Sequence, residues 1–340
     1  MQLIFFLPEI YRLTTGGNVF NNKLLFHLKK KLTVKIVIVG RDFRATDLSS
    51  PGKADEIWLV DSLLLQHYRW SEFLMNQPQP NKFLLLHYLS LFDTAKQFSE
   101  EAGKERQLLP NFSGFIVTSQ FSRQCLLKQE ISSRQIAVIQ PGIERKDLPS
   151  QKLKSNKIPQ LLTVSSIFPG KGLIEMIALL EQITDLTWQW NIIGEDRLDR
   201  SFTQIFRDKL QASAIAGRVK IHSPRRQKEL FLMYARSEIF LLPSHFETCS
   251  MVTMEAMASG LPVIAWQVGG LPELIEHQQT GYVIPYRDEH LFLEKLRELI
   301  DNDKIRQDFA VAARRRGGSF AGWDQSAERL INFIQDRINR

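Results

Sequence analysis

The chain has 340 residues, which is enough for two domains with separate hydrophobic cores. Apolar residues make up 44% of it and charged residues 24%, proportions that exclude a disordered chain and are typical of a globular protein. No apolar run approaches the roughly 18 residues that span a bilayer. The two cysteines, Cys125 and Cys249, are too few for a disulfide framework or a metal cluster of thiolates, and they favour a reducing, cytoplasmic location.

The net charge of +7 is carried mainly by the first 150 residues. No acidic residue lies between Glu9 and Asp42, whereas that stretch holds several basic ones. Within it, Val19–Lys35 interleaves apolar with basic side chains. This pattern predicts a local basic surface that could bind anionic lipid, a charged acceptor or nucleic acid, and a merely solvated helix face explains it equally well.

Short apolar runs alternate with helical stretches from residue 3 to residue 145, and this alternation predicts a parallel sheet with crossover helices. Helices are expected between the runs, notably around Val19–Lys31 and Phe121–Glu130. A polar stretch rich in Lys, Ser and Pro then leads to Pro159 and is the best candidate for a linker. The expected strands are Leu3–Leu7, Lys35–Val39, Glu56–Val60, Phe83–Leu86, Gly114–Thr118 and Ile136–Ile139.

A second alternation follows the linker and predicts a second open α/β sheet, so that two domains would face each other across a cleft. Strands are expected at Leu161–Ser165, Trp190–Ile193, Val219–Ile221, Ile239–Leu242 and Val263–Ala265. Helices are expected at Ile174–Ile183, Phe202–Ala216, Gln227–Arg236, Glu289–Ile300 and Lys304–Arg315. Gly317-Gly318 is expected to end the helical pattern before a terminal helix over Gln325–Ile338.

The segment 241–270, LLPSHFETCSMVTMEAMASGLPVIAWQVGG, carries the strongest functional signal. Glu247 follows a buried strand, so it should lie in a loop at the carboxyl end of the sheet, where such folds bind ligands. Glu255 should lie one to two turns into the next helix, which opens near Ser250. The backbone N–H groups of Ser250, Met251 and Val252 would then point out of the helix start toward a phosphate. Carboxylates for hydroxyls beside amides for phosphate indicate a nucleotide-sugar site.

The same segment resembles the donor-binding signature of the retaining glycosyltransferases of family 4, also known as glycosyl transferases group 1, which have the GT-B fold. It has the two glutamates, an Ala-Met-Ala-Ser-Gly-Leu-Pro-Val run from Ala256, and a Val-Gly-Gly-Leu-Pro-Glu turn from Val268. The resemblance implies two Rossmann-like, doubly wound domains. Residues 1–145 would bind the acceptor and be completed by a helix over 324–340 that crosses back to them, and residues 146–323 would bind the donor.

The resemblance also assigns roles to the two carboxylates. Glu247 would contact hydroxyls of the donor sugar, and Glu255 would accept hydrogen bonds from the ribose. A carboxylate suits both tasks because it accepts from two adjacent hydroxyls. Taken alone, each residue reads as an ordinary turn or exposed helix position.

Ser165–Gly172, SSIFPGKG, resembles the phosphate loop of that family, in which an arginine and a lysine hold the diphosphate. Lys171 matches the lysine, and an ammonium is a sound phosphate partner. Ser166 stands where the arginine is expected. Either diphosphate binding is weakened, or the second charge comes from another residue such as Arg197, Arg225 or Arg226.

Two further places in the first domain match the family pattern. Gly16 and Gly17 follow the first strand and precede the first helix, where glycines let the backbone approach a ligand. His87 ends the strand FLLLH, where it could hydrogen-bond the transferring sugar or move protons. A simple turn and a core histidine are the plain alternatives.

The sequence lacks the residues that are central to several other enzyme chemistries. The one Asp-x-Asp sequence, Asp301-Asn302-Asp303, falls between two helices and predicts a cap, and the resemblance implies no required metal or other cofactor. Phosphate loops of the Walker type, the Gly-x-Gly-x-x-Gly fingerprint after the first strand and the Gly-x-Ser-x-Gly elbow do not occur. The sequence therefore argues against kinase-like ATPases, dinucleotide dehydrogenases and α/β-hydrolases.

The leading hypothesis is a metal-independent, retaining glycosyltransferase that moves a sugar from a UDP- or GDP-linked donor to an acceptor hydroxyl, in the synthesis of polysaccharide, glycolipid or another glycoconjugate. His87, Lys171 and Glu247 would serve the reaction itself. No carboxylate nucleophile is evident, so departure and attack on the same face of the sugar is expected. The alternatives are a binding or scaffold protein that kept the fold without turnover, and a basic nucleic-acid binder, which lacks a recognisable reading module. Attachment to the inner face of a membrane through Val19–Lys35 is a further hypothesis.

Overall fold

The computed structural model describes the chain except for residues 1, 41, 44–55, 78–80, 149–156 and 340. By its contacts, the chain divides into two units. Unit 1 comprises Met1–Arg12, Gly17–Gly142 and Ala321–Arg340, and unit 2 comprises Leu13–Gly16 and Ile143–Phe320. Each unit is built on one six-stranded sheet.

The sheet of unit 1 is parallel throughout, with the strand order β2-β1-β3-β4-β5-β6. Side chains of its central strands point into helix-covered layers on both faces, which is why these strands read as continuous apolar runs. The order reverses between β1 and β3, so the loops that follow these two strands meet at the carboxyl edge. The strands are β1 (Gln2–Pro8), β2 (Thr33–Val39), β3 (Glu56–Asp61), β4 (Lys82–Leu86), β5 (Gly114–Val117) and β6 (Ile136–Val138).

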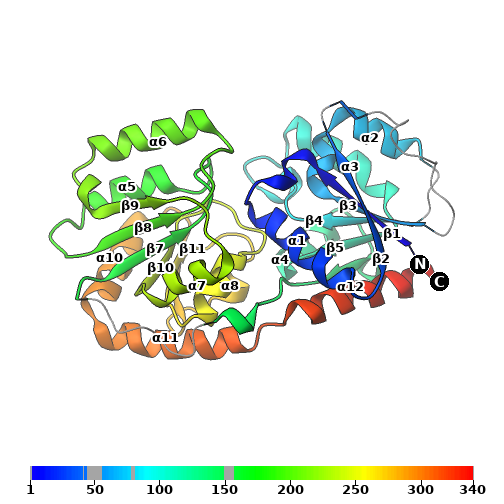
Figure 1. Ribbon diagram of the computed structural model, residues 1–340. Coiled ribbons are helices and arrows are strands. Elements are labelled where there is room, and N and C mark those ends of the chain that lie inside the picture. Colours follow the sequence, from blue (N-terminus) through cyan, green and yellow to red (C-terminus); the bar gives the residue numbers. More distant parts are fainter. Residues whose placement is uncertain (1, 41, 44–55, 78–80, 149–156, 340) are drawn as a thin grey trace. The chain divides into compact units, whose positions relative to one another are not determined.

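Helices of unit 1 lie on both faces of this sheet (Figure 1). The C-terminal helix packs beside α1, where the rings of Phe20 and Trp323 meet edge to face at 5.3 Å. Gly142 accepts the close approach of this helix, because a Cβ there would lie 2.2 Å from the Trp323 nitrogen. The helices are α1 (Gly16–Leu28), α2 (Tyr68–Met75), α3 (Glu100–Leu108), α4 (Gln120–Leu127) and α12 (Trp323–Ile338).

The sheet of unit 2 is also parallel, with the strand order β12-β11-β10-β7-β8-β9. The order reverses between β7 and β10, which are hydrogen-bonded neighbours. This reversal brings together the loops after β7 and after β10. The strands are β7 (Gln160–Val164), β8 (Gln189–Ile193), β9 (Val219–His222), β10 (Ile239–Leu242), β11 (Val263–Trp266) and β12 (Gly281–Ile284).

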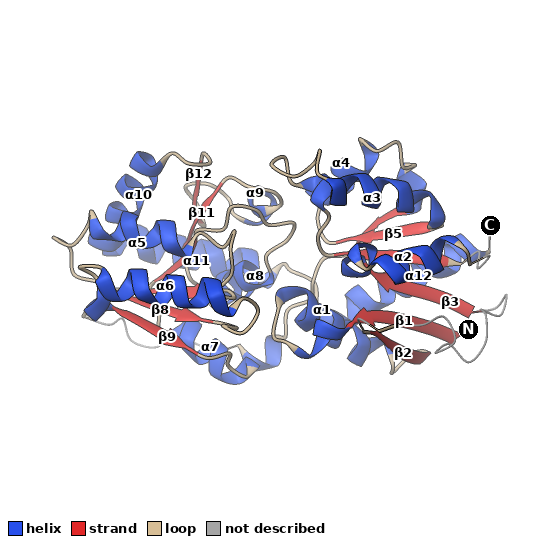
Figure 2. Ribbon diagram, turned by 90° about the horizontal axis from the view of Figure 1, so that it is seen from above, coloured by secondary structure: helices blue, strands red, loops and turns tan. Residues whose placement is uncertain are grey.

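Figure 1 shows α5 and α6 on one face of the second sheet and α7, α8 and α11 on the other, and Figure 2 shows the same helices from above. Both faces of the sheet are therefore covered, as in a doubly wound fold. The helices are α5 (Leu173–Glu181), α6 (Arg200–Ala212), α7 (Gln227–Ala235), α8 (Met251–Ala258), α9 (Leu271–Leu274), α10 (Glu289–Asp301) and α11 (Asp303–Gly318).

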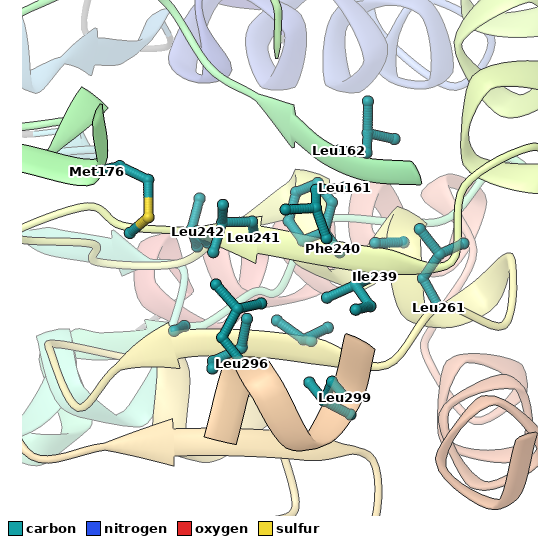
Figure 3. Close-up of a cluster of buried hydrophobic side chains, with 14 of the residues drawn as sticks. Leu161, Leu162, Met176, Ile239, Phe240, Leu241, Leu242, Leu261, Leu296 and Leu299 are labelled. Atoms are coloured by element: carbon teal, nitrogen blue, oxygen red, sulfur yellow. The ribbon is translucent and has the colours of Figure 1, made fainter. Parts of the chain in front are cut away.

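The core of unit 2 is formed by side chains of its central strands and the helices that cover them (Figure 3). Leu161, Phe240 and Leu241 have no exposed surface, and Leu296 and Leu299 of α10 pack over them from the helix layer. Complete burial of such a side chain contributes about 1.5–3 kcal/mol. This rigid layer supports the loops at the carboxyl edge of the sheet.

The expected parallel strands are confirmed in both units, with ends displaced by at most two residues. One detail is wrong: the first helix already begins at Gly16, so the glycine pair lies in its first turn rather than before it. Helix α11 ends at Gly318, at the glycine pair where the helical pattern is expected to end. A Cβ at Gly317 would lie 2.3 Å from the Ala258 Cα, so this glycine serves the close packing of α11 on α8.

The expected linker between Arg145 and Pro159 lies largely outside the described residues. Its first residues form a short 3-10 turn at Arg145–Asp147. Among the described helices, none combines the length and the apolar character that crossing a bilayer requires.

Candidate functional site

The loops after β7 and β10 of unit 2 are joined by two polar contacts. Lys171 Nζ donates to Glu247 Oε1 at 2.7 Å, and the backbone nitrogen of His245 donates to the Gly170 carbonyl at 2.9 Å. The Lys171 side chain is 30% exposed and that of Glu247 is 13% exposed. Two of the residues proposed from sequence therefore lie within one ion pair at the point where the strand order reverses.

Glycines allow these backbones to approach. Gly172 has a φ of +67°, and a Cβ there would lie 2.0 Å from the Pro243 carbonyl oxygen. Gly269 has a φ of +52°, and a Cβ there would lie 1.8 Å from the Glu247 carbonyl oxygen. The nitrogen of Gly270 donates to that same oxygen at 2.8 Å. The glycine pair of the sequence signature thus packs directly on the main chain of Glu247 and fixes its position.

Helix α8 begins directly after this loop. Ser250 is its N-cap, and the serine hydroxyl accepts from the Thr253 nitrogen at 3.4 Å. Amides in the first turn of a helix have no partner four residues earlier, and the helix dipole adds partial positive charge there. The amides of Met251 and Val252 lie at the helix start that the sequence predicts, and a helix start of this kind is able to bind an anion.

Glu255 lies in the middle of α8, and two side chains of α7 hold its carboxylate. Gln227 Nε2 donates to one oxygen at 2.9 Å, and the Tyr234 hydroxyl donates to the other at 3.2 Å. Gln227 and Tyr234 are seven residues apart, so they share one face of α7. Burial raises the pKa of the Tyr234 hydroxyl, and the Glu255 charge raises it further, so the phenol remains a donor. The carboxylate of Glu255 is thereby oriented rather than mobile.

The loop around Ser166 rests on the loop that follows β8. A Cβ at Gly194 would lie 1.9 Å from the Ser165 carbonyl oxygen, and the Ile167 nitrogen donates to the Glu195 carbonyl at 2.8 Å. Arg197 donates to both carboxylate oxygens of Glu195, at 2.6 and 2.7 Å. These bonds lower the pKa of the fully buried Glu195.

The three arginines considered as replacements at the phosphate therefore differ in their surroundings. Arg197 is paired with Glu195, although its side chain is 60% exposed. Arg225 and Arg226 are exposed just before α7. Ser166 itself is partly buried and brings no charge to the loop.

In unit 1, Gly17 and His87 are in contact, because a Cβ at Gly17 would lie 3.3 Å from the imidazole ring. His87 follows β4, and its Nε2 lies 2.8 Å from Asn21 Oδ1. Burial lowers the pKa of His87, and the nearby Asp61 opposes this effect. Gly16 belongs by its contacts to unit 2 and opens α1.

The Asp-x-Asp sequence caps helices, as predicted. Asp301 ends α10, and Asn302 caps α11 by accepting from the Ile305 nitrogen at 3.1 Å. Asp303 opens α11 and pairs with Arg306. Throughout the described ranges, no group of three or more His, Cys, Asp or Glu side chains is arranged to hold a metal ion.

Sequence reasoning missed several residues that shape these sites. Asp61 is the last residue of the buried strand β3, and this position at the carboxyl end of the strand was the signal that could have identified it. Asn21 carries no comparable signal, since its partner Asp61 lies 40 residues away. The carboxylate of Glu195 pairs with Arg197, two residues further on. His245 was given no role, yet its Nε2 lies 3.2 Å from Glu175 Oε1 and its nitrogen joins the two loops.

Two doubly wound parallel sheets, with a helix start and the Lys171–Glu247 ion pair at the reversal point of the second, define a two-unit α/β protein of the Rossmann-like class. The family model described as glycosyl transferases group 1 matches residues 144–316, just over half of the chain. The chain therefore belongs to this family, as the sequence segment 241–270 predicts.

Curated relatives include D-inositol 3-phosphate glycosyltransferases of two Corynebacterium species. That of C. diphtheriae is 38% identical over 122 residues, covering 36% of this chain and 28% of the relative. That of C. glutamicum is 27% identical over 250 residues, covering 69% and 60%. Spore coat protein SA of Bacillus subtilis is 32% identical over 112 residues, covering 32% and 30%. The chain thus spans less than two thirds of the length of these relatives.

Solved structures share the fold over nearly the whole chain. Sucrose-phosphate synthase of Thermosynechococcus elongatus has a TM-score of 0.83 at 17% identity and full coverage of both chains. Anabaena HepE in complex with UDP-glucose has a TM-score of 0.81 at 15% identity, with 98% and 99% coverage. The expected GT-B fold, with two parallel α/β sheets, is therefore confirmed.

Proposed function

We propose that this protein is a retaining glycosyltransferase that transfers a sugar from a nucleoside diphosphate sugar to an acceptor hydroxyl, in the synthesis of a polysaccharide, glycolipid or other glycoconjugate. Unit 2 binds the donor and unit 1 binds the acceptor. Membership in the glycosyl transferase group 1 family and the names of the curated relatives support the reaction class. The UDP-glucose complex of the HepE structure makes a UDP-linked sugar the first donor to test.

The observation that carries the proposal is the 2.7 Å contact between Lys171 and Glu247. In a nucleoside diphosphate sugar, the outer phosphate is bonded directly to the sugar. A cation for that phosphate and a carboxylate for the sugar hydroxyls must therefore lie side by side, as these two residues do. On binding, Lys171 exchanges Glu247 for phosphate oxygens, and Glu247 accepts from sugar hydroxyls.

The remaining donor contacts follow from the position of α8. The Ser250–Val252 amides at the start of this helix face the diphosphate. Glu255, three residues after Val252 in the same helix, accepts hydrogen bonds from the ribose hydroxyls. During transfer, negative charge grows on the leaving diphosphate while the sugar gains positive character. Amides fixed by the helix start, together with Lys171, stabilise the negative charge on the diphosphate, and preorganised donors of this kind usually make the largest single contribution to catalysis.

The reaction proceeds with retention and without a metal in this proposal. Glu247 is assigned to hydroxyls of the donor sugar, so it is not the nucleophile of a double displacement. Departure of the diphosphate and attack by the acceptor on the same face of the sugar fits the cations and amides gathered at the phosphate position. His87 contributes a contact to the transferring sugar from the acceptor unit.

The test is a thermal-shift screen of UDP- and GDP-sugars, followed by calorimetry and a donor-hydrolysis or transfer assay. A donor present at a hundredfold excess over its dissociation constant stabilises the fold by about 2.7 kcal/mol. Turnover should persist in EDTA, and NMR of the product should show the anomeric configuration of the donor. A protein that binds no nucleotide-sugar, or a product of inverted configuration, contradicts the proposal.

One observation favours a second candidate, a binding protein without turnover. Ser166 replaces the arginine expected at the phosphate, and the neighbouring Arg197 is held by Glu195. Tight binding of a nucleotide-sugar with no hydrolysis and no transfer to any acceptor would establish this alternative. Replacement of Ser166 by arginine should then raise affinity for the diphosphate.

A further inference from the structure

Three polar side chains form a connected chain at the carboxyl edge of the first sheet. Asn21 comes from α1, Asp61 from the end of β3 and His87 from the end of β4. Asn21 Nδ2 lies 2.6 Å from Asp61 Oδ2, and Asn21 Oδ1 lies 2.8 Å from His87 Nε2. Asn21 and Asp61 have no exposed surface. Because these groups are buried, a donor or acceptor that lacks a partner in the protein cannot form a hydrogen bond with water instead.

The direction of this chain is set by Asp61. An ionised carboxylate only accepts hydrogen bonds, so Asn21 must present its NH₂ group to it. The amide oxygen of Asn21 then faces His87, and that oxygen also only accepts. The imidazole nitrogen 2.8 Å away must therefore carry a hydrogen. Reversal of the Asn21 amide would set its oxygen against the Asp61 carboxylate at 2.6 Å, which is repulsive.

The imidazole ring is fixed in its plane by packing. Gly17 lies against its Cγ–Cδ2 edge, where a Cβ would come within 3.3 Å, and the Phe20 ring meets it at 5.1 Å. Rotation of the ring by half a turn would place a carbon against Asn21 Oδ1 and would leave a buried amide oxygen without this donor. The ring orientation and the amide orientation therefore support each other.

We propose that Asp61 is a positioning residue that acts through Asn21 to hold His87 as the neutral tautomer with its proton on Nε2. A neutral imidazole has a single N–H, so Nδ1 is then an acceptor. Burial disfavours the charged ring, and Asp61 Oδ2, at 3.7 Å from Nε2, is the charged group that faces it. The neighbours from α1 and from the turn after β3, Gly17, Phe20 and Ser62, are uncharged.

Capping alone does not account for a carboxylate at position 61. Asp61 Oδ1 accepts from the Leu63 nitrogen at 2.9 Å and caps the 3-10 turn Ser62–Gln66. An asparagine oxygen would cap this turn equally well, without the cost of burying a charge. What only the carboxylate supplies is an acceptor on its second oxygen, and this acceptor sets the orientation of Asn21.

The consequence for transfer rests on the proposed function, in which His87 contacts the transferring sugar. A sugar hydroxyl can donate to Nδ1 of this tautomer, whereas the other tautomer would present an N–H there. His87 thus discriminates by accepting a hydrogen bond, and it does not serve as a proton donor at neutral pH. Asp61 touches no substrate in this scheme.

The decisive experiment is a two-bond ¹H–¹⁵N correlation spectrum of the full-length protein labelled with ¹⁵N-histidine, at pH 8. The chain has seven histidines, and the signals of His87 are identified by their loss in H87Q. The expected result is a protonated, pyrrole-type Nε2 and an unprotonated, pyridine-type Nδ1. A pyrrole-type Nδ1 in the wild-type protein overturns the proposal without any variant.

D61N tests the role of Asp61 itself. The new amide presents NH₂ to Asn21, so Asn21 turns its oxygen toward it and its own NH₂ toward His87. The two nitrogen signals of His87 should then exchange character. An unchanged tautomer in D61N overturns the relay. S62A is the control: Ser62 Oγ accepts from the His87 backbone nitrogen at 3.1 Å, so its loss disturbs the same loop and should leave the tautomer unchanged.

The activity of D61N links the tautomer to transfer. In D61N, Nδ1 of His87 would present an N–H donor where the sugar hydroxyl needs an acceptor. This change should lower kcat by about tenfold to a hundredfold, the scale of one strong hydrogen bond. UDP affinity should stay within twofold, since the nucleotide contacts lie in unit 2. A wild-type protein with the Nε2–H tautomer but no transfer would refute the proposed function alone, whereas active D61N with an exchanged tautomer would refute the link.

Discussion

Gly269 packs so closely on Glu247 that a Cβ on it would stand 1.8 Å from the Glu247 carbonyl oxygen. The nitrogen of the next residue, Gly270, donates to the same oxygen at 2.8 Å. A glycine pair from the turn after β11 therefore determines where the carboxylate after β10 stands. Its place in the sequence signature is a matter of main-chain packing rather than of ligand contact.

G269A should consequently damage the donor site from a distance. Both the φ of +52° and the 1.8 Å approach are incompatible with a Cβ, so the Glu247 backbone must shift. We expect a loss of about 1–3 kcal/mol in the free energy of unfolding by urea. Donor turnover should fall by more than the nucleotide affinity does.

G217A is the matched control for this substitution. Gly217 lies in a 3-10 turn of the same unit, and a Cβ there would meet no atom within 4 Å. Its free energy of unfolding should change by less than about 0.5 kcal/mol. If G269A behaved like G217A, the packing of the glycine pair would not be what positions Glu247.

The strands and the reversal point were predictable from sequence because continuous apolar runs mark strands that are covered on both faces. The proximity of Lys171 and Glu247 follows from the same logic, since both residues stand after strands that flank the reversal. Side-chain pairing between distant segments was not predictable. Asn21 and Asp61 are 40 residues apart, and only the finished sheet brings their amide and carboxylate together. The packing role of Gly317 was not predictable either, because the sequence does not show that Ala258 lies against it.

Substitutions of Lys171 and Glu247 should distinguish recognition of the phosphate from recognition of the sugar in binding experiments. K171M removes a charge-assisted hydrogen bond, so UDP affinity should fall by about tenfold to a hundredfold while uridine affinity is unchanged. E247Q should weaken a UDP-sugar relative to UDP. Calorimetry with uridine, UDP and the UDP-sugar measures all three. Equal effects of K171M on uridine and UDP would place Lys171 away from the diphosphate.

Substitution of Glu255 should show whether this carboxylate binds the ribose hydroxyls. E255Q replaces one acceptor oxygen by a donor and disturbs the contacts with Gln227 and Tyr234. We expect UDP affinity to fall by about tenfold or more, whereas affinity for UDP lacking one ribose hydroxyl should fall much less. The control is Y234F, which keeps the carboxylate and should retain the discrimination between UDP and its deoxy forms. A discrimination unchanged in E255Q would assign the ribose to another residue.

The buried His87 should make the fold sensitive to mild acid. Burial lowers its pKa in the folded protein below the ordinary 6.5, so the unfolded chain takes up the proton first as the pH falls. Because the unfolded state then binds more protons, stability decreases as the pH drops below about 6.5, until the folded-state pKa is reached. Urea unfolding between pH 8 and pH 5 measures this loss. H87Q has no titrating ring at this position and should show a shallower decline; parallel pH profiles for both proteins would contradict the expectation.

The basic residues directly after α1 offer a test of attachment to a membrane surface. Lys29, Lys30 and Lys31 are exposed there, and Lys30 Nζ lies 4.3 Å from the ring centroid of Phe26, whose side chain is 59% exposed. We expect the protein to float with vesicles rich in phosphatidylserine at low salt. With vesicles of phosphatidylcholine alone, it should stay in the soluble fraction. Each lysine near an anionic surface contributes about 1 kcal/mol, so replacing all three by glutamine should reduce partitioning by about a hundredfold.

A matched control replaces the exposed Lys209, Lys220 and Lys228 of unit 2, which changes the net charge equally and should leave flotation intact. Equal losses in both variants would show that net charge, and not the surface formed by α1, is responsible.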